Sequence, residues 1–88
     1  MQNQLEMKEL KDTAEMMSSA NYEERFKAEY LQLKIRFQKL INMIDGWDEG
    51  ELEFTPTCPR STYNLQIRAM ADYMAVLEAR AVMESIDL

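Results

Sequence analysis

The stretch YEERFKAEYLQLKIRFQKLINMID, residues 22–45, decides the fold of this chain. Its large apolar residues are spaced alternately four and three residues apart: Phe26, Tyr30, Leu33, Phe37, Leu40 and Ile44, with Trp47 next. This spacing lasts roughly three heptads and is typical of a helix that packs along another helix. Asn21 can cap its start, with Glu24 three residues later as in a capping box. Gly46 is expected to end it, so we predict a helix over 22–45.

A second long helix is predicted over residues 59–85. One apolar stripe consists of Tyr63, Ile67, Met70, Met74, Leu77 and Ala81. A second stripe consists of Leu65, Ala69, Tyr73, Val76 and Met83. A single partner helix cannot cover both stripes, because together they exceed the width of one helix-packing seam. We therefore expect the first stripe to pack on the 22–45 helix and the second stripe to pack on another subunit of a homo-oligomer.

The remaining segments complete an all-α architecture. Residues 4–17 form a short helix with one weak apolar stripe, and a helix of this length must dock to be stable. The connection, residues 46–58, is acidic at first and then contains both prolines of the chain. We expect one domain over 1–88, an antiparallel helical hairpin of two long helices with a short extra N-terminal helix. That short helix can dock within its own subunit or swap onto a neighbour.

Composition excludes several functions. Ten Lys and Arg residues stand against 16 Asp and Glu residues, giving a net charge of −6, and a DNA or RNA partner requires a basic face. No histidine is present, which removes the commonest general base and metal ligand. We expect no enzyme activity, metal or cofactor. The one cysteine cannot form an internal disulfide and no apolar run reaches the ~20 residues of a membrane span, so we expect a cytoplasmic protein that binds no membrane.

The segment FTPTCPR, residues 54–60, is the candidate ligand site. It ends at the start of a predicted helix, where free N–H groups and the helix dipole favour an anion. The Arg60 guanidinium can bind a phosphate. The expected ligand-binding residues are Phe54, Thr55, Thr57, Cys58, Arg60, Ser61 and Tyr63, with Arg25 from a second subunit. The alternative is a rigid helix connection in which Arg60 pairs with Glu51 or Glu53.

Residues 22–88 resemble small helical-hairpin proteins encoded by bacteriophages. The resemblance is carried by ERFKAEY (24–30), by FTPTCP (54–59) and by QIRAMADYMAVLEARA (66–81). The hairpin is similar to the anti-CBASS and anti-Thoeris sponge proteins of phages. That resemblance implies an α-helical homo-oligomer, often a hexamer. It also implies that the protein sequesters cyclic oligonucleotide or cyclic ADP-ribose signals without catalysis.

We therefore expect a phage anti-defence protein of the host bacterial cytoplasm. Its ligand would be a small anionic nucleotide, a cyclic-nucleotide-type immune second messenger, bound between subunits. The alternative is a protein-interaction module that inhibits a host or phage protein through the second apolar stripe of 59–85. A structural role in virion assembly has no specific support in the sequence, and an enzyme is the least expected, because Cys58 has no histidine to activate it.

Overall fold

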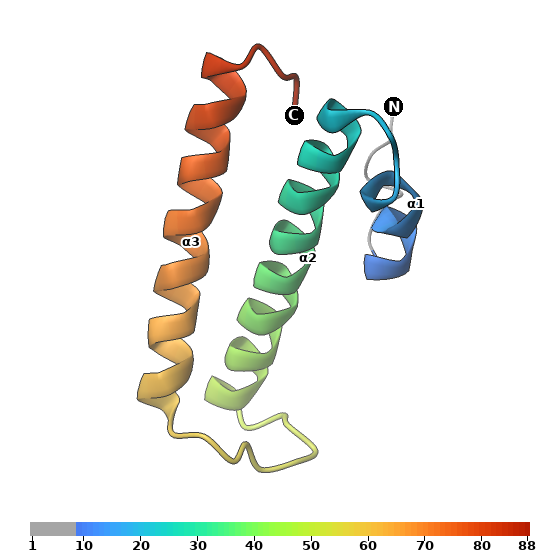
Figure 1. Ribbon diagram of the computed structural model, residues 1–88. Helices are drawn as coiled ribbons and strands as arrows, with labels where there is room; N and C mark the ends of the chain where they lie inside the picture. The colour runs from blue at the N-terminus through green and yellow to red at the C-terminus, as the bar shows by residue number, and fades with distance from the viewer. Residues whose placement is uncertain (1–8) are drawn as a thin grey trace.

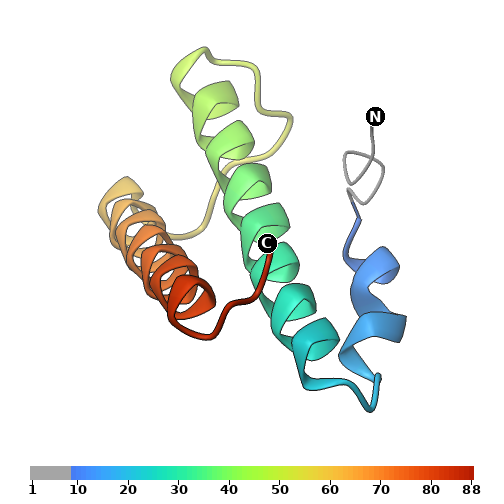
Figure 2. The same ribbon diagram turned by 90° about the horizontal axis from the view of Figure 1, so that it is seen from above.

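A computed structural model describes residues 9–88, and over this range it contains helices and no strand. The all-α prediction is therefore confirmed for these residues. The elements are the 3₁₀ helix η2 (Leu10–Thr13) and the α-helices α1 (Ala14–Met17), α2 (Tyr22–Asp48) and α3 (Arg60–Met83). Both α1 and α3 pack on α2, from different sides, and α2 and α3 run in opposite directions (Figures 1 and 2). No helix of this part of the chain is both long and apolar enough to cross a membrane.

Helix α2 begins as expected and ends later than expected. The Asn21 side chain accepts hydrogen bonds from the N–H groups of Glu23 and Glu24, at 2.8 and 3.4 Å. The helix continues through Gly46 to Asp48, three residues beyond the predicted end at 45.

The residue that stops α2 is Gly50. Its φ of +72° is a left-handed conformation that suits glycine. The N–H groups of Gly50 and Glu51 donate to the carbonyls of Trp47 and Gly46, at 3.0 and 2.8 Å, which is a Schellman motif. Gly46 lies inside the helix, where an added Cβ would approach Leu52 to 3.4 Å. Trp47 therefore belongs to the last turn of α2.

Helix α3 starts at Arg60, with Pro59 at the N-cap position, and ends at Met83, two residues before the predicted end at 85. It also ends in a Schellman motif, because the N–H of Ile86 donates to the carbonyl of Ala81 at 2.8 Å. Ser85 occupies the left-handed position of this motif, with φ 59°. The turn buries the Ile86 side chain.

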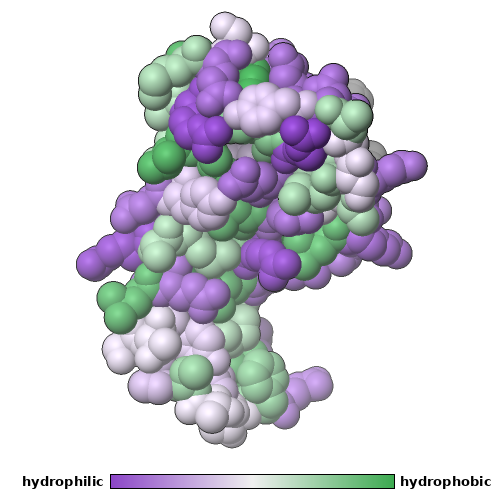
Figure 3. All heavy atoms as spheres, viewed as in Figure 1, coloured by the Kyte–Doolittle hydropathy of each residue, from purple (hydrophilic) through white to green (hydrophobic). Residues whose placement is uncertain are grey.

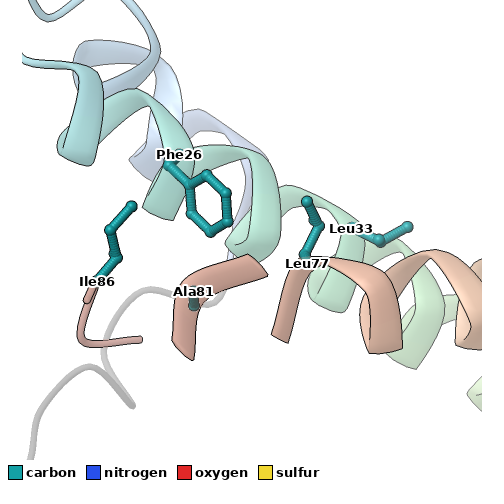
Figure 4. Close-up of a cluster of buried hydrophobic side chains, with 5 residues drawn as sticks. All are labelled: Phe26, Leu33, Leu77, Ala81 and Ile86. Carbon is teal, nitrogen blue, oxygen red and sulfur yellow. The ribbon is translucent and has the colours of Figure 1, made fainter. Parts of the chain in front are cut away.

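The apolar core lies between α2 and α3, at the end of the pair away from their connecting loop. It consists of Phe26, Leu33, Leu77, Ala81 and Ile86 (Figure 4). Met70 and Met74 pack against this cluster. Leu77 and Ala81 are the only buried residues within α3. The half of α3 nearest the loop therefore has no fully buried side chain, and other contacts hold it against α2.

Tyrosine–glutamate hydrogen bonds also link the two long helices. Tyr30 of α2 donates to Glu78 of α3 at 2.5 Å, and Tyr73 of α3 donates to Glu29 of α2. Tyr22 donates to Glu84, directly after α3, at 2.6 Å. These bonds lie at exposed positions and join residues far apart in the sequence, so they fix the register of α2 against α3.

The η2–α1 segment packs against α2 of its own chain. Thr13 is fully buried there, and Gln32 of α2 donates to its hydroxyl at 2.9 Å. Lys39 of α2 forms an ion pair with Glu9 at 3.1 Å. The predicted helix over 4–17 is therefore helical from Leu10 in two short pieces, and its residues 4–8 lie outside the described range.

Candidate functional site

The loop between α2 and α3 forms a pocket against the last turn of α2. Its volume is about 210 Å³, and its lining residues are Trp47, Gly50, Leu52, Phe54, Thr55 and Pro56. Most of these side chains are apolar, and the lower end of the molecule in Figure 3, where Figure 1 places the loop, is coloured largely white and green. The pocket exists because α2 extends to Asp48 and so carries Trp47 to its wall.

Arg60 lies at the start of α3 and is held by two residues of the last turn of α2. Its guanidinium donates two hydrogen bonds to the Asp48 carboxylate, one of them 3.1 Å long. It also lies over the Trp47 ring, 5.7 Å from the ring centre. The hydrogen bond between the two groups raises the pKa of Arg60 and lowers the pKa of Asp48. Arg60 is thus paired within the chain, and its partner is Asp48 where the sequence suggested Glu51 or Glu53.

Tyr63 contacts the same tryptophan one turn further along α3. The two rings meet edge to face, with centres 6.0 Å apart and planes at 80°. Burial raises the pKa of Tyr63, and the neighbouring Cys58 side chain acts in the same direction. The Trp47 ring is therefore fixed by Arg60 and Tyr63 together, while the pocket lies beside it.

The structure brings most of the expected site residues to this end of the molecule. Phe54 and Thr55 line the pocket, Arg60 and Tyr63 contact Trp47, and Cys58 adjoins Tyr63. Thr57 and Ser61 are exposed and do not line the pocket.

Arg25 is not near the loop in a single chain. It lies near the start of α2, at the opposite end from Trp47, and its guanidinium donates to the Ser19 carbonyl at 2.8 Å. Its expected contribution from a second subunit stays a prediction.

Trp47 is the site residue that sequence reasoning missed. Placing the helix end at Gly46 left Trp47 outside the helix, so its contacts with Arg60 and Tyr63 could not be predicted. The available signal was Gly50, a second glycine that could also end the helix. Because Trp47 is the only tryptophan of the chain, it also reports directly on this pocket.

The electrostatics of the loop end are mixed. Five carboxylates lie between positions 45 and 53: Asp45, Asp48, Glu49, Glu51 and Glu53. The Arg60 guanidinium is already paired with Asp48. An anionic group is therefore favoured only at the start of α3, where the first backbone N–H groups of the helix lie, and disfavoured inside the pocket.

Within residues 9–88, no group of three or more Cys, Asp or Glu side chains is arranged to hold a metal ion. A family model described as Sequestin matches residues 20–83. The match begins just before α2 and ends with α3, so it includes the whole loop and the pocket. No curated protein and no solved structure matches the chain.

Proposed function

Since this chain belongs to the Sequestin family, we propose that it binds and sequesters a small ligand without converting it. The family name points to sequestration, and the matched residues include every residue that lines the loop pocket. We further propose that the ligand is a cyclic-nucleotide-type immune second messenger and that the protein is a phage anti-defence protein of the bacterial cytoplasm. The resemblance of residues 22–88 to phage sponge proteins supports this finer assignment.

The observation that carries the proposal is the pocket beside Trp47 and its position next to the start of α3. Aromatic and apolar walls suit the base of a nucleotide, and the start of a helix suits its phosphate. Phe54 and Thr55 would contact the base, together with Trp47. Thr57, Arg60 and Ser61 would contact the phosphate, with Arg60 exchanging the Asp48 carboxylate for it.

The size of the pocket bears on how the ligand is shared between subunits. At about 210 Å³ it is smaller than the roughly 300–1,000 Å³ of pockets for drug-sized ligands. One chain would therefore enclose one ring system of a nucleotide rather than a whole cyclic dinucleotide. A second subunit would cover the rest, and Arg25 is the residue that we propose it supplies.

A homo-oligomer is supported by the surface of α3. The second apolar stripe is exposed along the helix, with Leu65, Val76 and Met83 retaining 64%, 55% and 76% of their accessible surface. The radius of gyration is 15.1 Å, against about 12 Å for a compact domain of this length. We propose that further copies of the chain cover this stripe.

The test is a thermal-shift screen against cyclic dinucleotides, cyclic trinucleotides and cyclic ADP-ribose isomers. A ligand that binds only the folded state at 100 times its Kd stabilises that state by about 2.7 kcal/mol. For a chain of 88 residues we expect the melting temperature to rise by roughly 10 °C or more. A well-folded protein whose melting temperature responds to none of these ligands would contradict the messenger assignment.

The same exposed stripe supports a second candidate function, a protein-interaction module that inhibits a host or phage protein. Exposed apolar side chains along one helix can serve as anchors for a partner helix. This function requires no response to nucleotides. It predicts instead that Val76→Glu abolishes partner capture while Phe54→Ala leaves it unchanged.

A further inference from the structure

We infer that α3 pairs with α3 of a second copy of the chain in the antiparallel orientation, and that Asp72 selects this orientation. The inference rests on the homo-oligomer of the proposed function and deepens it, because it names the surface and the geometry through which two copies meet. It does not depend on the identity of the ligand.

The surface is a regular seam of residues along the exposed side of α3. All its members are exposed, and they follow one another at alternating intervals of four and three residues: Leu65, Ala69, Asp72, Val76, Ala79 and Met83. This is the spacing of the positions that meet when two helices pack along each other. Leu65, Val76 and Met83 retain 64%, 55% and 76% of their accessible surface, so other parts of residues 9–88 do not cover the seam.

The seam keeps its pattern of large and small side chains when it is read in the reverse direction. If a second α3 runs antiparallel, with Leu65 of one copy level with Met83 of the other, every member of the seam has a counterpart. Large side chains then meet at both ends, and Ala69 meets Ala79 between them, where small side chains let two helices approach closely. A two-fold interface between identical copies has to be self-complementary in this way.

Asp72 is the charged member of the seam, and the two orientations place it differently. In a parallel pair each seam residue faces the same residue of the second copy, so the two Asp72 carboxylates would meet and repel each other. In the antiparallel pair each Asp72 lies level with Val76 of the second copy, and Arg68, one turn away on its own helix, can pair with it. A polar residue at a seam position can fix how paired helices align. Asp72 therefore favours the antiparallel pair.

The charge of α3 also suits a contact between identical chains. The helix carries three arginines against two acidic residues, a net charge of +1, whereas the whole chain carries −6. The excess of acidic residues, which would repel a second copy, therefore lies outside α3. An antiparallel pair also aligns the two helix dipoles favourably.

Cross-linking through single cysteines tests the orientation. Cys58, the only natural cysteine, is replaced by serine, and one new cysteine is then introduced and treated with a short bismaleimide. In the antiparallel pair the two copies of position 76 lie about 6 Å apart along the helix axis and the two copies of position 65 about 27 Å apart. Because of this difference in separation, we expect Val76→Cys to give about tenfold more covalent dimer than Leu65→Cys.

Two controls complete this experiment. An equilibrated mixture of Leu65→Cys and Met83→Cys should form a covalent dimer that neither variant forms alone, since these positions are level in the antiparallel pair. Ala71→Cys should form none, because Ala71 is exposed on a different side of α3.

The role of Asp72 is tested in the Leu65→Cys chain. Asp72→Ala removes the repulsion that disfavours the parallel pair, so Leu65→Cys should then form a covalent dimer on its own. Asp72→Glu keeps the charge and should leave it unlinked. If Leu65→Cys stays unlinked in Asp72→Ala as well, Asp72 does not select the orientation.

The outcomes separate this inference from the proposed function. Equal linking of Val76→Cys and Leu65→Cys, each alone, would overturn the antiparallel pair in favour of a parallel one. No covalent dimer from any variant, in a protein that light scattering shows to be an oligomer, would overturn the contact through α3 and leave the homo-oligomer intact. A monomer by light scattering would overturn both, while the thermal response to nucleotides would still decide sequestration independently.

Discussion

The guanidinium of Arg60, at the start of α3, lies 5.7 Å from the centre of the Trp47 ring, on the last turn of α2. This contact joins the two ends of the loop that lines the pocket. The Asp48 carboxylate, next to Trp47, binds the same guanidinium. A change at Arg60 therefore alters both the proposed anion-binding group and the support of the aromatic wall.

The variant Arg60→Ala tests the role of this residue. We expect unchanged helix content by circular dichroism and little change in melting temperature, because the Arg60–Asp48 pair is exposed and such pairs contribute little to stability. The affinity for the nucleotide ligand should fall by about tenfold or more, since hydrogen bonds to charged groups contribute about 1.5–3 kcal/mol. Arg60→Lys should restore part of it. Unchanged affinity in Arg60→Ala, measured by calorimetry, would remove Arg60 from the site.

The variant Leu77→Ala tests the core. Leu77 is fully buried between the long helices, so its truncation should lower the free energy of unfolding by about 2–5 kcal/mol. The control is Val82→Ala, at a position that retains 80% of its accessible surface, where we expect a change of no more than ~0.5 kcal/mol. Urea unfolding followed by circular dichroism measures both. Equal losses in the two variants would mean that the helices pack differently.

Replacing Ser85 tests the end of α3. Its φ of 59° is a conformation that is unfavourable for a residue with a side chain and that glycine adopts freely. We expect Ser85→Gly to raise the free energy of unfolding by about 0.5–1 kcal/mol. Ser85→Ala should give no such gain, because alanine keeps the unfavourable Cβ. A loss of stability in Ser85→Gly would contradict the Schellman motif at this position.

The tyrosine–glutamate bonds predict a loss of stability at alkaline pH. Burial, followed by the hydrogen bond to Glu78, raises the pKa of Tyr30 from its ordinary value of 10.0 to about 12. The folded state thus favours the neutral phenol, and this contribution is fully present below pH 10 and is lost as the pH rises through 12. Between pH 9 and pH 11, the free energy of unfolding measured with urea should fall less for Tyr30→Phe than for the protein without substitutions. An equal fall in the free energy of unfolding for both proteins would exclude Tyr30 as the source of the alkaline loss of stability.

The exposed stripe of α3 predicts a specific effect on assembly. Val76→Glu places a charge at the centre of the stripe and should dissociate the proposed oligomer while preserving helix content. Ala71→Glu is the matched control, because Ala71 is exposed on a different side of the same helix. Light scattering coupled to size-exclusion chromatography measures the mass of each. If the protein without substitutions is a monomer at micromolar concentration, the proposed homo-oligomer is contradicted.

The sequence was a better guide to the helices than to the site. The four-and-three spacing from Phe26 to Ile44 was sufficient to predict α2, because a long, regular apolar seam has few other solutions. The end of α2 was not predictable from local rules, since Gly46 and Gly50 both suit a helix end. Gly46 remains helical although glycine costs about 1 kcal/mol relative to alanine there.

That one ambiguity determined what could be predicted of the site. With the helix ending at 45, Trp47 and Asp48 belonged to a loop, and neither had a defined position relative to Arg60. Once α2 extends to Asp48, both face the start of α3. Phe54 and Thr55 could be proposed from the sequence because the two prolines that follow them, Pro56 and Pro59, restrict the loop. Their meeting with Trp47 in one pocket depended on the tertiary arrangement.

The most direct test of sequestration is to recover the ligand from its complex. The full chain is mixed with the cyclic nucleotide that gives the largest thermal shift, free ligand is removed by gel filtration, and the complex is heated to unfold the protein. A sequestering protein should retain the nucleotide through filtration and release it chemically unchanged, in a fixed ratio to the protein chain, as measured by chromatography and mass spectrometry. Recovery of a hydrolysed or rearranged nucleotide, or of none from the filtered protein, would contradict sequestration without catalysis.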